Sequence, residues 1–425
     1  MDPNFDRPNV VVILTDDQPK HTIDRMPILK ALMRDRGTEF GRAYVADPLC
    51  SPNRASLLLG RFLHNHGIKN NKRPTGGARA FADKGYDGLT YGKALRDSGY
   101  LTGYFGKWFN DYGGAERPAG WDRWYALVEN RAGSFDVADG NRVKTVDKGP
   151  GDESDHLAAH AANWVARRSS PFLCVFSTPH PHGPYGPGWT AARHRDDFDG
   201  VSRPSGRPYD DSPEVYRPAD TGPARHREDY EGKLEELRVV DDNIRRIVSA
   251  VDSLGQLGNT YFFFLSDNGW FLGEHGLDDK GKFYDESSQT PFVVRGPGVP
   301  EGVVRPELVS AVDLYPTILD IAGLDGSDRD GRSVLPLLRG ESTRWRKRLL
   351  VEHGVGQHFR MVREEALCYV EAAGHEPVTY DMVEDPQQRR NAYDTLPEDE
   401  KARRATTASE LGGCSGLSCR AAEEA

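Results

Sequence analysis

The sequence predicts an α/β protein with a central, mostly parallel sheet flanked by helices, followed by a small antiparallel sheet with a helix. Three uninterrupted apolar runs, at residues 9–15, 172–177 and 261–266, lack the polar alternation of a half-exposed strand. Such runs are typical of strands that are buried on both faces of a parallel sheet. Amphipathic segments separate these runs, and several short strand-like segments lie near the end of the chain.

Helices are expected between the buried strands, because a parallel sheet needs both of its faces covered. The longest expected helix carries apolar residues at helical spacing from Leu234 onward and ends near Gly255. Two further strands are expected at residues 100–105 and 290–298. The expected helices span residues 26–37, 89–99, 155–168, 229–257 and 313–322.

A change in composition divides the chain into two predicted parts. Residues 325–330 are rich in Gly, Asp and Ser, which marks a plausible boundary. We therefore expect a large α/β domain at residues 1–328 and a small subdomain at residues 329–425. The short strands expected in the second part span residues 349–352, 359–362, 367–371 and 379–381, with a helix after them.

The composition excludes some classes of protein. The 425 residues carry a formal net charge of −10, which argues against a nucleic-acid-binding protein. No run approaches the roughly 20 apolar residues that cross a bilayer, so no membrane span is expected. The N-terminus lacks the pattern of a signal peptide. The protein is thus expected to be secreted or periplasmic if a leader was removed, and cytoplasmic otherwise.

The five cysteines are too few for a disulfide scaffold. Cys174 lies in an apolar run and Cys368 lies in an expected strand, so both are interpreted as buried thiols. Cys414 and Cys419 bracket four residues, a spacing that could close a small loop in an oxidising compartment.

Acidic and amide side chains follow two of the buried strands. Asp16 and Asp17 come directly after the first strand, and Asp267 and Asn268 follow the strand at 261–266. Ligands bind at the carboxyl ends of the strands in open α/β sheets. An all-oxygen set suits Ca²⁺ or Mg²⁺ better than Zn²⁺. We interpret these residues as ligands of one divalent cation, although a solvated turn would also explain each pair alone.

Cys50 lies where a loop enters a helix. Pro52 suits the first position of a helix, which places Cys50 just outside the helix N-terminus, where negative charge is favoured. Arg54 adds a cation in the first turn. This setting suits a nucleophile that attacks an anionic group, whereas a buried structural thiol is the simpler interpretation of a single cysteine.

Two other segments at strand ends carry candidate site residues. Lys107 follows a glycine at the end of an expected strand. His180 and His182 lie in a loop rich in Pro and Gly, and such loops commonly carry function. Residues 183–227 show no period and are interpreted as a loop that covers the site and helps select the substrate, or as a mobile surface insertion.

The motifs together resemble one family, the formylglycine-dependent sulfatases of the alkaline-phosphatase-like superfamily. The resemblance extends from Val10 to about Cys419. It rests on Cys-x-Pro-x-Arg at residues 50–54 with Ala-Ser-Leu-Leu-Leu-Gly after it, Gly-Lys-Trp at 106–108 and Gly-Glu-His-Gly at 273–276. Segments similar to the N-acetylglucosamine-6-sulfatase branch lie at residues 64–71, 110–113 and 414–420.

The resemblance implies an alkaline-phosphatase-like fold and a set of site residues. Cys50 would be oxidised to formylglycine by a formylglycine-generating enzyme, and the hydrate of the aldehyde would be the nucleophile. Asp16, Asp17, Cys50, Asp267 and Asn268 would hold one divalent cation, with Ca²⁺ favoured over Mg²⁺. The residues expected to neutralise the sulfate are Arg54, Lys107, His182 and Lys280.

At three positions the match to the family leaves a choice between residues or departs from the family pattern. His182 matches the sulfate-contacting histidine of the family better than His180 does. Counting five residues from the histidine of Gly-Glu-His-Gly selects Lys280, and Lys282 is the alternative register. Phe109 stands where the family usually has histidine, so one hydrogen-bonding group is missing near the expected sulfate.

The implied function is hydrolysis of a sulfate ester. The expected substrate is a small molecule or an oligosaccharide that carries sulfate on a sugar, such as an N-acetylglucosamine 6-sulfate, or an aryl sulfate. Two alternatives stay open at this point. One is a phosphate or phosphonate monoester hydrolase of the same superfamily, and the other is a non-catalytic, metal-stabilised carbohydrate-binding protein in which Cys50 stays a thiol.

Overall fold

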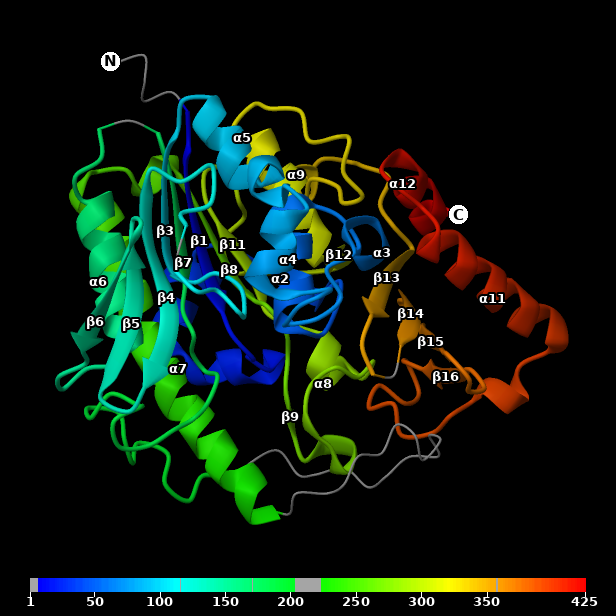
Figure 1. Ribbon diagram of the computed structural model, residues 1–425. Helices are drawn as coiled ribbons and strands as arrows, with labels where there is room; N and C mark the ends of the chain where they lie inside the picture. The colour runs from blue at the N-terminus through cyan, green and yellow to red at the C-terminus, as the bar shows by residue number, and fades with distance from the viewer. Residues whose placement is uncertain (1–6, 115, 170, 203–222, 357) are drawn as a thin grey trace.

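A computed structural model describes residues 7–425 except residues 115, 170, 203–222 and 357. Its central layer is a ten-stranded sheet (Figure 1). The strands lie in the order β12 (Val303–Ser310), β2 (Thr38–Tyr44), β11 (Phe292–Arg295), β8 (Thr260–Ser266), β1 (Asn9–Thr15), β7 (Phe172–Ser177), β3 (Leu101–Lys107), β4 (Arg123–Arg131), β5 (Ser134–Asp139) and β6 (Arg142–Asp147).

The middle of the sheet is parallel, as the apolar runs predict. The neighbouring strands β8, β1, β7, β3 and β4 all pair in parallel, and β2 pairs in parallel with β12. Antiparallel pairing is confined to β11 and to the β4–β5–β6 meander. Val12 of β1 lies between Val175 of β7 and Phe263 of β8. The carboxyl ends of these three strands therefore meet at one edge.

Helices cover both faces of the sheet, so every side chain of β1 is buried. Successive side chains of a strand point to opposite faces. Val10 and Val12 accordingly pack in the core beneath α2, whereas Val11 and Ile13 pack in the core beneath α7. On the first side lie α2 (Cys50–Leu59), α3 (Leu63–His66), α4 (Gly77–Asp83), α5 (Tyr91–Asp97), α9 (Leu314–Ile321) and α10 (Leu335–Leu338). On the second side lie α1 (Pro27–Leu29), α6 (Glu153–Val165) and α7 (Pro223–Ser253).

A four-stranded antiparallel sheet forms the C-terminal part, as predicted, and two helices follow it where the sequence predicts one (Figure 1). A third apolar core joins this sheet to the segment around Phe283 and Tyr284, which leads to α8 (Asp285–Ser288). Its elements are β13 (Arg348–His353), β14 (Phe359–Glu364), β15 (Leu367–Ala372), β16 (Val378–Asp381), α11 (Glu398–Gly412) and α12 (Leu417–Glu424). The expected boundary at residues 328 and 329 stays a prediction.

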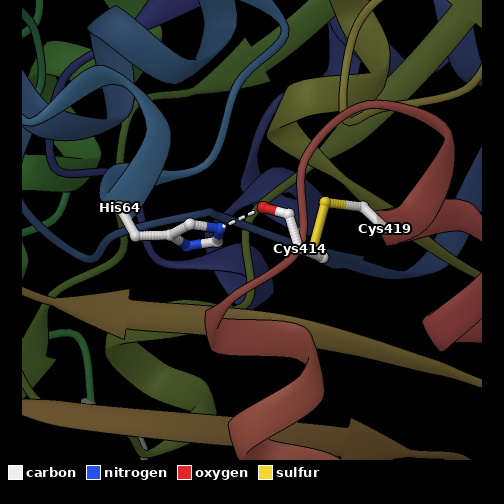
Figure 2. Close-up of side chains that lie close together, drawn as sticks. All are labelled: His64, Cys414 and Cys419. Atoms are coloured by element: carbon white, nitrogen blue, oxygen red, sulfur yellow. Dashed lines mark hydrogen bonds between the residues drawn. A yellow bond between two sulfur atoms is a disulfide. The ribbon is translucent and has the colours of Figure 1, made fainter.

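A disulfide between Cys414 and Cys419 closes the loop from α11 to α12. Figure 2 shows this loop beside His64 of α3, whose Nε2 lies 2.8 Å from the carbonyl oxygen of Cys414. The other three cysteines are buried thiols. The disulfide loop thus contacts a helix that lies about 350 residues earlier in the chain.

The sequence analysis missed or misplaced several elements. It predicted neither β2 nor β12, and it missed the meander β4–β6, whose outer strand is largely exposed and charged. The helix α7 begins at Pro223, whereas the sequence predicts a start at residue 229. The sequence does not reveal the first turns because they are polar and show no apolar period. Of the expected covering loop at 183–227, residues 203–222 lie outside the described residues, and residues 223–227 are helical. No helix in the described part of the chain is both long and apolar enough to cross a membrane.

Candidate functional site

Three carboxylates and an amide are buried together where β1 and β8 end. Thr15 of β1 pairs with Ser266 of β8, so the residues that follow, Asp16 and Asp267, emerge side by side. Asp16, Asp17, Asp267 and Asn268 are all fully buried. One ligand atom from each of the three aspartates and the Sγ of Cys50 lie within 4.8 Å of one another.

The donor atoms of this cluster fit a hard divalent cation. Asp17 Oδ2 and Asn268 Oδ1 are buried and accept no hydrogen bond from the described residues. A buried oxygen without a donor is costly unless a cation faces it. Carboxylate and amide oxygens are the ligands that Ca²⁺ and Mg²⁺ prefer. The predicted metal ligands therefore come together in a set that could hold such an ion.

Cys50 is the first residue of α2, so the helix begins two residues earlier than the position of Pro52 predicts. The Cys50 side chain faces the acidic cluster. The Sγ lies 3.7 Å from Asp16 Oδ1 and 3.0 Å from the Nζ of Lys280. Burial raises the pKa of the Cys50 thiol to about 12, although Lys107 and Lys280 act in the opposite direction. The unmodified thiol is therefore protonated at neutral pH and is a weak nucleophile.

The predicted cations surround Cys50 and the carboxylates. Lys107 forms an ion pair with Asp16, and Lys280 forms one with Asp17. Burial lowers the pKa of each lysine, but these carboxylates outweigh it and raise both pKa values above their usual range. Both ammonium groups are therefore charged. Lys280, the lysine that the motif count selects, therefore lies at the cluster.

Arg54 connects α2 to three strand ends. Its Nε donates to Asp267 Oδ2 at 2.8 Å, and one terminal nitrogen donates to Ser177 Oγ and to the Lys107 carbonyl oxygen, both at 2.8 Å. Burial raises the pKa of Asp267 to about 6, and the repulsion of Asp16 adds to that effect. The Arg54 guanidinium is fully buried, as are Asp16 and Asp267. Its charge therefore compensates carboxylates that are shielded from water.

The two histidines of the Pro/Gly-rich loop point in different directions. His182 Nε2 lies 3.6 Å from Asp17 Oδ2, and 44% of the His182 side chain is exposed. His180 is buried between Asp152 and Glu236, at 3.0 and 3.1 Å. Burial lowers the pKa of His180, but the two carboxylates raise it well above its usual value. Only His182 therefore faces the acidic cluster.

Phe109 turns away from the cluster and into the apolar core. Its ring lies 4.6 Å from that of Phe81 and packs edge-on against Trp108. The next residue, Asn110, accepts a hydrogen bond from Ser51 Oγ at 3.0 Å. Phe109, which stands where the family usually has histidine, thus packs in the apolar core of this chain. Asn110 anchors Ser51, the residue after Cys50.

Two contributors to the site were not predicted from the sequence. Lys233 of α7 is fully buried and donates to the carbonyl oxygens of Asp17 and Pro181, at 3.1 and 3.0 Å. Its ammonium also lies 4.5 Å from the centre of the Trp270 ring. A lysine within the apolar period of a long helix is the signal that could have identified it.

Asn53 was also missed, although it lies within the Cys50 motif. Its Nδ2 donates to the Asp267 carbonyl oxygen at 2.6 Å, and its Oδ1 accepts from the Ala46 amide at 2.9 Å. The Asn53 side chain is fully buried. This residue therefore ties α2 to the end of β8 and to the segment that leads into Cys50.

The order of these motifs agrees with a known family. A family model described as Sulfatase matches residues 8–324, which is most of the chain. The chain belongs to the sulfatase family. A second family model, described as N-sulphoglucosamine sulphohydrolase, C-terminal, matches residues 273–408.

Relatives and solved structures agree with this membership. N-acetylglucosamine-6-sulfatase from Homo sapiens is 34% identical over 376 residues, which cover 82% of this chain and 67% of that protein. The chain thus spans about two thirds of the length of the curated relatives that it matches first. These relatives confirm the resemblance to the N-acetylglucosamine-6-sulfatase branch.

Two solved structures confirm the fold. The first is a protein in complex with its substrate D-glucosamine-2-N,6-O-disulfate. It superimposes with a TM-score of 0.82 at 22% identity, and the match covers 95% of this chain and 96% of that one. The second is the phosphonate monoester hydrolase of Agrobacterium radiobacter, with a TM-score of 0.75 at 21% identity and coverage of 98% and 96%.

We predict that Asn53→Ala lowers the free energy of unfolding by about 2–4 kcal/mol, because a buried carbonyl and a buried amide both lose their partner. Urea denaturation followed by far-UV circular dichroism measures this change. The matched control is Asn141→Ala, in the exposed turn between β5 and β6, which should change the stability by less than about 0.5 kcal/mol. Equal stability of the two variants would contradict the anchoring role of Asn53.

Proposed function

We propose that this member of the sulfatase family hydrolyses sulfate esters of sugars through a formylglycine formed from Cys50. The observation that carries the proposal is the position of Cys50. It begins helix α2, its Sγ lies 3.0 Å from the Lys280 ammonium, and it shares one cluster with three buried aspartates. A nucleophile at this position would meet an anionic group already surrounded by cations.

The state of the thiol supports its conversion to formylglycine. A buried thiol with a pKa of about 12 gives little thiolate at neutral pH, so Cys50 itself is poorly suited to attack sulfur. The hydrate of formylglycine supplies an oxygen nucleophile and a second hydroxyl whose deprotonation releases the bound sulfate. A formylglycine-generating enzyme is the partner that this maturation requires.

The metal is proposed to be one divalent cation held by Asp16, Asp17, Asp267 and Asn268 together with the matured Cys50. Ca²⁺ is favoured over Mg²⁺, because Mg²⁺ usually keeps several of its waters, whereas the donors here are buried side chains. When bound, the cation supplies positive charge that acidifies a coordinated hydroxyl and attracts a sulfate oxygen.

The cationic side chains would bind the sulfate group and position the nucleophile. Lys107 and Lys280 would pair with the sulfate oxygens in place of Asp16 and Asp17, and their charge would stabilise the transition state. Arg54 would hold the nucleophile through its contacts with Asp267. These residues would thus orient the sulfur atom in line with the attacking oxygen.

His182 or Lys280 would donate the proton that the leaving alcohol needs. His182 Nδ1 lies 2.6 Å from the carbonyl oxygen of Gly183, which can only accept, so Nδ1 carries a proton. The other nitrogen, Nε2, faces Asp17. This nitrogen would donate the proton to the ester oxygen.

An amino sugar that carries a 6-sulfate is the proposed substrate class. The relative from Homo sapiens bears the name N-acetylglucosamine-6-sulfatase, and the substrate of the first solved structure is a disulfated glucosamine. Both names support this choice. A phosphate or phosphonate monoester is the second candidate, because the phosphonate monoester hydrolase shares the fold and the same cations would bind a tetrahedral phosphoryl group.

We predict that the protein from a host with the maturing enzyme hydrolyses 4-nitrophenyl sulfate at least about tenfold faster than 4-nitrophenyl phosphate, compared as kcat/KM. Cys50→Ala should abolish sulfate release and keep the far-UV circular dichroism spectrum, because the change removes the nucleophile and one proposed cation ligand but leaves the four oxygen-bearing side chains of the cluster in place. A higher kcat/KM for the phosphate would favour the second candidate. Full activity in the alanine variant would refute the proposed nucleophile.

We predict that Ca²⁺ added to chelator-treated protein raises the temperature of unfolding, and that Mg²⁺ at the same concentration raises it less. A site-specific ion at a hundredfold excess over its dissociation constant stabilises the folded state by about 2.7 kcal/mol. Differential scanning fluorimetry measures the shift, and Asp17→Asn should abolish most of it. An equal shift in the Asp17 variant would place the ion elsewhere.

A further inference from the structure

The loop between α11 and α12 brings two sulfur atoms beside a histidine of α3 (Figure 2). A ring nitrogen of His64 and the Sγ atoms of Cys414 and Cys419 all lie within 4.8 Å of one another. Both cysteines are buried, and only 17% of the His64 side chain is exposed. None of these three residues belongs to the proposed sulfate site.

The chemistry of this group depends on the redox state of its sulfur atoms. A disulfide persists in an oxidising compartment, whereas a reducing compartment keeps cysteines as thiols. Thiolates bind metals, and two thiolates with one imidazole are ligands that Zn²⁺ prefers. The oxygen atoms around Asp16 suit a different class of ion. The reduced loop, together with His64, therefore offers a donor set for zinc.

Glu352 orients the His64 ring in the way that zinc ligands are commonly oriented. His64 Nδ1 lies 2.7 Å from Glu352 Oε2, and Nε2 lies 2.8 Å from the Cys414 carbonyl oxygen. Both partners accept, so both ring nitrogens carry a proton in the disulfide form. A histidine that binds a metal through one nitrogen usually donates from the other to a carboxylate or a carbonyl. Glu352 thus holds Nδ1 and leaves Nε2 directed at the loop.

The Cys414 carbonyl oxygen does not depend on His64 for a hydrogen bond. Asn65 Nδ2 donates to the same oxygen at 2.9 Å and to Asp330 Oδ2 at 2.8 Å. The Gly416 amide donates to the other oxygen of Asp330 at 2.7 Å. If Nε2 of His64 bound a metal, the Cys414 carbonyl oxygen would still have a donor. The loop backbone would also keep its contacts with Asp330.

The helix that follows the loop supplies a carboxylate to two buried arginines. Glu423 of α12 pairs with Arg332 at 2.8 Å and with Arg346 at 3.0 Å. The side chains of Glu423 and Arg346 are fully buried. If α12 came away, these guanidinium groups would lose part of the charge that compensates their burial, which is costly. A link that replaces the reduced disulfide would help to keep α12 in place.

We propose that His64, Cys414 and Cys419 bind one Zn²⁺ when the disulfide is reduced. A dithiol supplies the two electrons and two protons that convert the disulfide into two thiols, and the dithiol itself becomes a disulfide. Zn²⁺ then displaces one proton from each thiol and one from His64 Nε2, and the three protons pass to water. A water molecule takes the fourth tetrahedral position. The inference goes beyond the proposed function and does not depend on it.

The test measures zinc binding by the full-length Cys50→Ala protein, because this change removes the thiol from the acidic cluster. One sample keeps its disulfide, and the other is reduced with a water-soluble phosphine, which is oxidised to its phosphine oxide. Ca²⁺ is present throughout to occupy the proposed oxygen site. Zinc per chain is measured after gel filtration. Co²⁺ serves as a second probe, because thiolate ligands give it a strong charge-transfer absorption.

We predict that the reduced protein binds one more Zn²⁺ per chain than the disulfide form and that only the reduced protein shows the Co²⁺–thiolate absorption. His64→Ala should abolish most of this additional binding, because a ligand is lost. Glu352→Gln should weaken it by about 10- to 100-fold, because the His64 ring loses its carboxylate partner. The matched control is His358→Ala, an exposed histidine outside the cluster, which should bind zinc as the parent protein does.

A variant that cannot form the disulfide keeps the test independent of the reductant. Cys419→Ser should bind no additional zinc, with or without the phosphine. Zinc should raise the unfolding temperature of the reduced parent protein and leave that of the disulfide form unchanged. Equal zinc binding by the reduced and disulfide forms would overturn the inference. Undiminished Co²⁺–thiolate absorption in His64→Ala or in Cys419→Ser would overturn it as well, because the metal would then lie elsewhere.

Discussion

The burial of three carboxylates at the ends of β1 and β8 is the constraint on which the rest of the site depends. Like charges removed from water repel strongly unless opposite charges lie beside them. The opposite charges here are the guanidinium of Arg54 and the ammonium groups of Lys107 and Lys280, and each forms an ion pair with one of the aspartates. Each of these cations comes from a different segment of the chain, so the cluster can form only when these segments have come together.

The residues that surround the buried carboxylates also make buried polar contacts. Lys233 of α7 reaches under the sheet edge to the carbonyl oxygens of Asp17 and Pro181. His180, one residue before Pro181, is held between two buried carboxylates. These contacts fix the turn after β1 and the loop that carries His182, so the His182 imidazole is held on a rigid base.

The sequence predicted the interior of the fold better than its edges. Strands buried on both faces, such as β1, are continuous apolar runs, whereas β2 is interrupted by Gly41 and charged residues and shows no period. The four oxygen-bearing residues proposed to hold the cation were predictable because each follows a buried strand. Lys233 was not predicted, because its hydrogen bond to the Asp17 carbonyl oxygen joins segments that are more than 200 residues apart. Its place within the apolar period of α7 marks the residue as unusual but does not identify its partner.

One measurement tests most directly whether Cys50 is converted to formylglycine. The protein is purified from its native host and digested with trypsin, and the mass of the peptide from Ala43 to Arg54 is determined. We predict the mass of a peptide in which formylglycine replaces cysteine. A peptide that carries only the unmodified thiol would contradict it, and the buried cluster would then belong to a metal-stabilised binding protein.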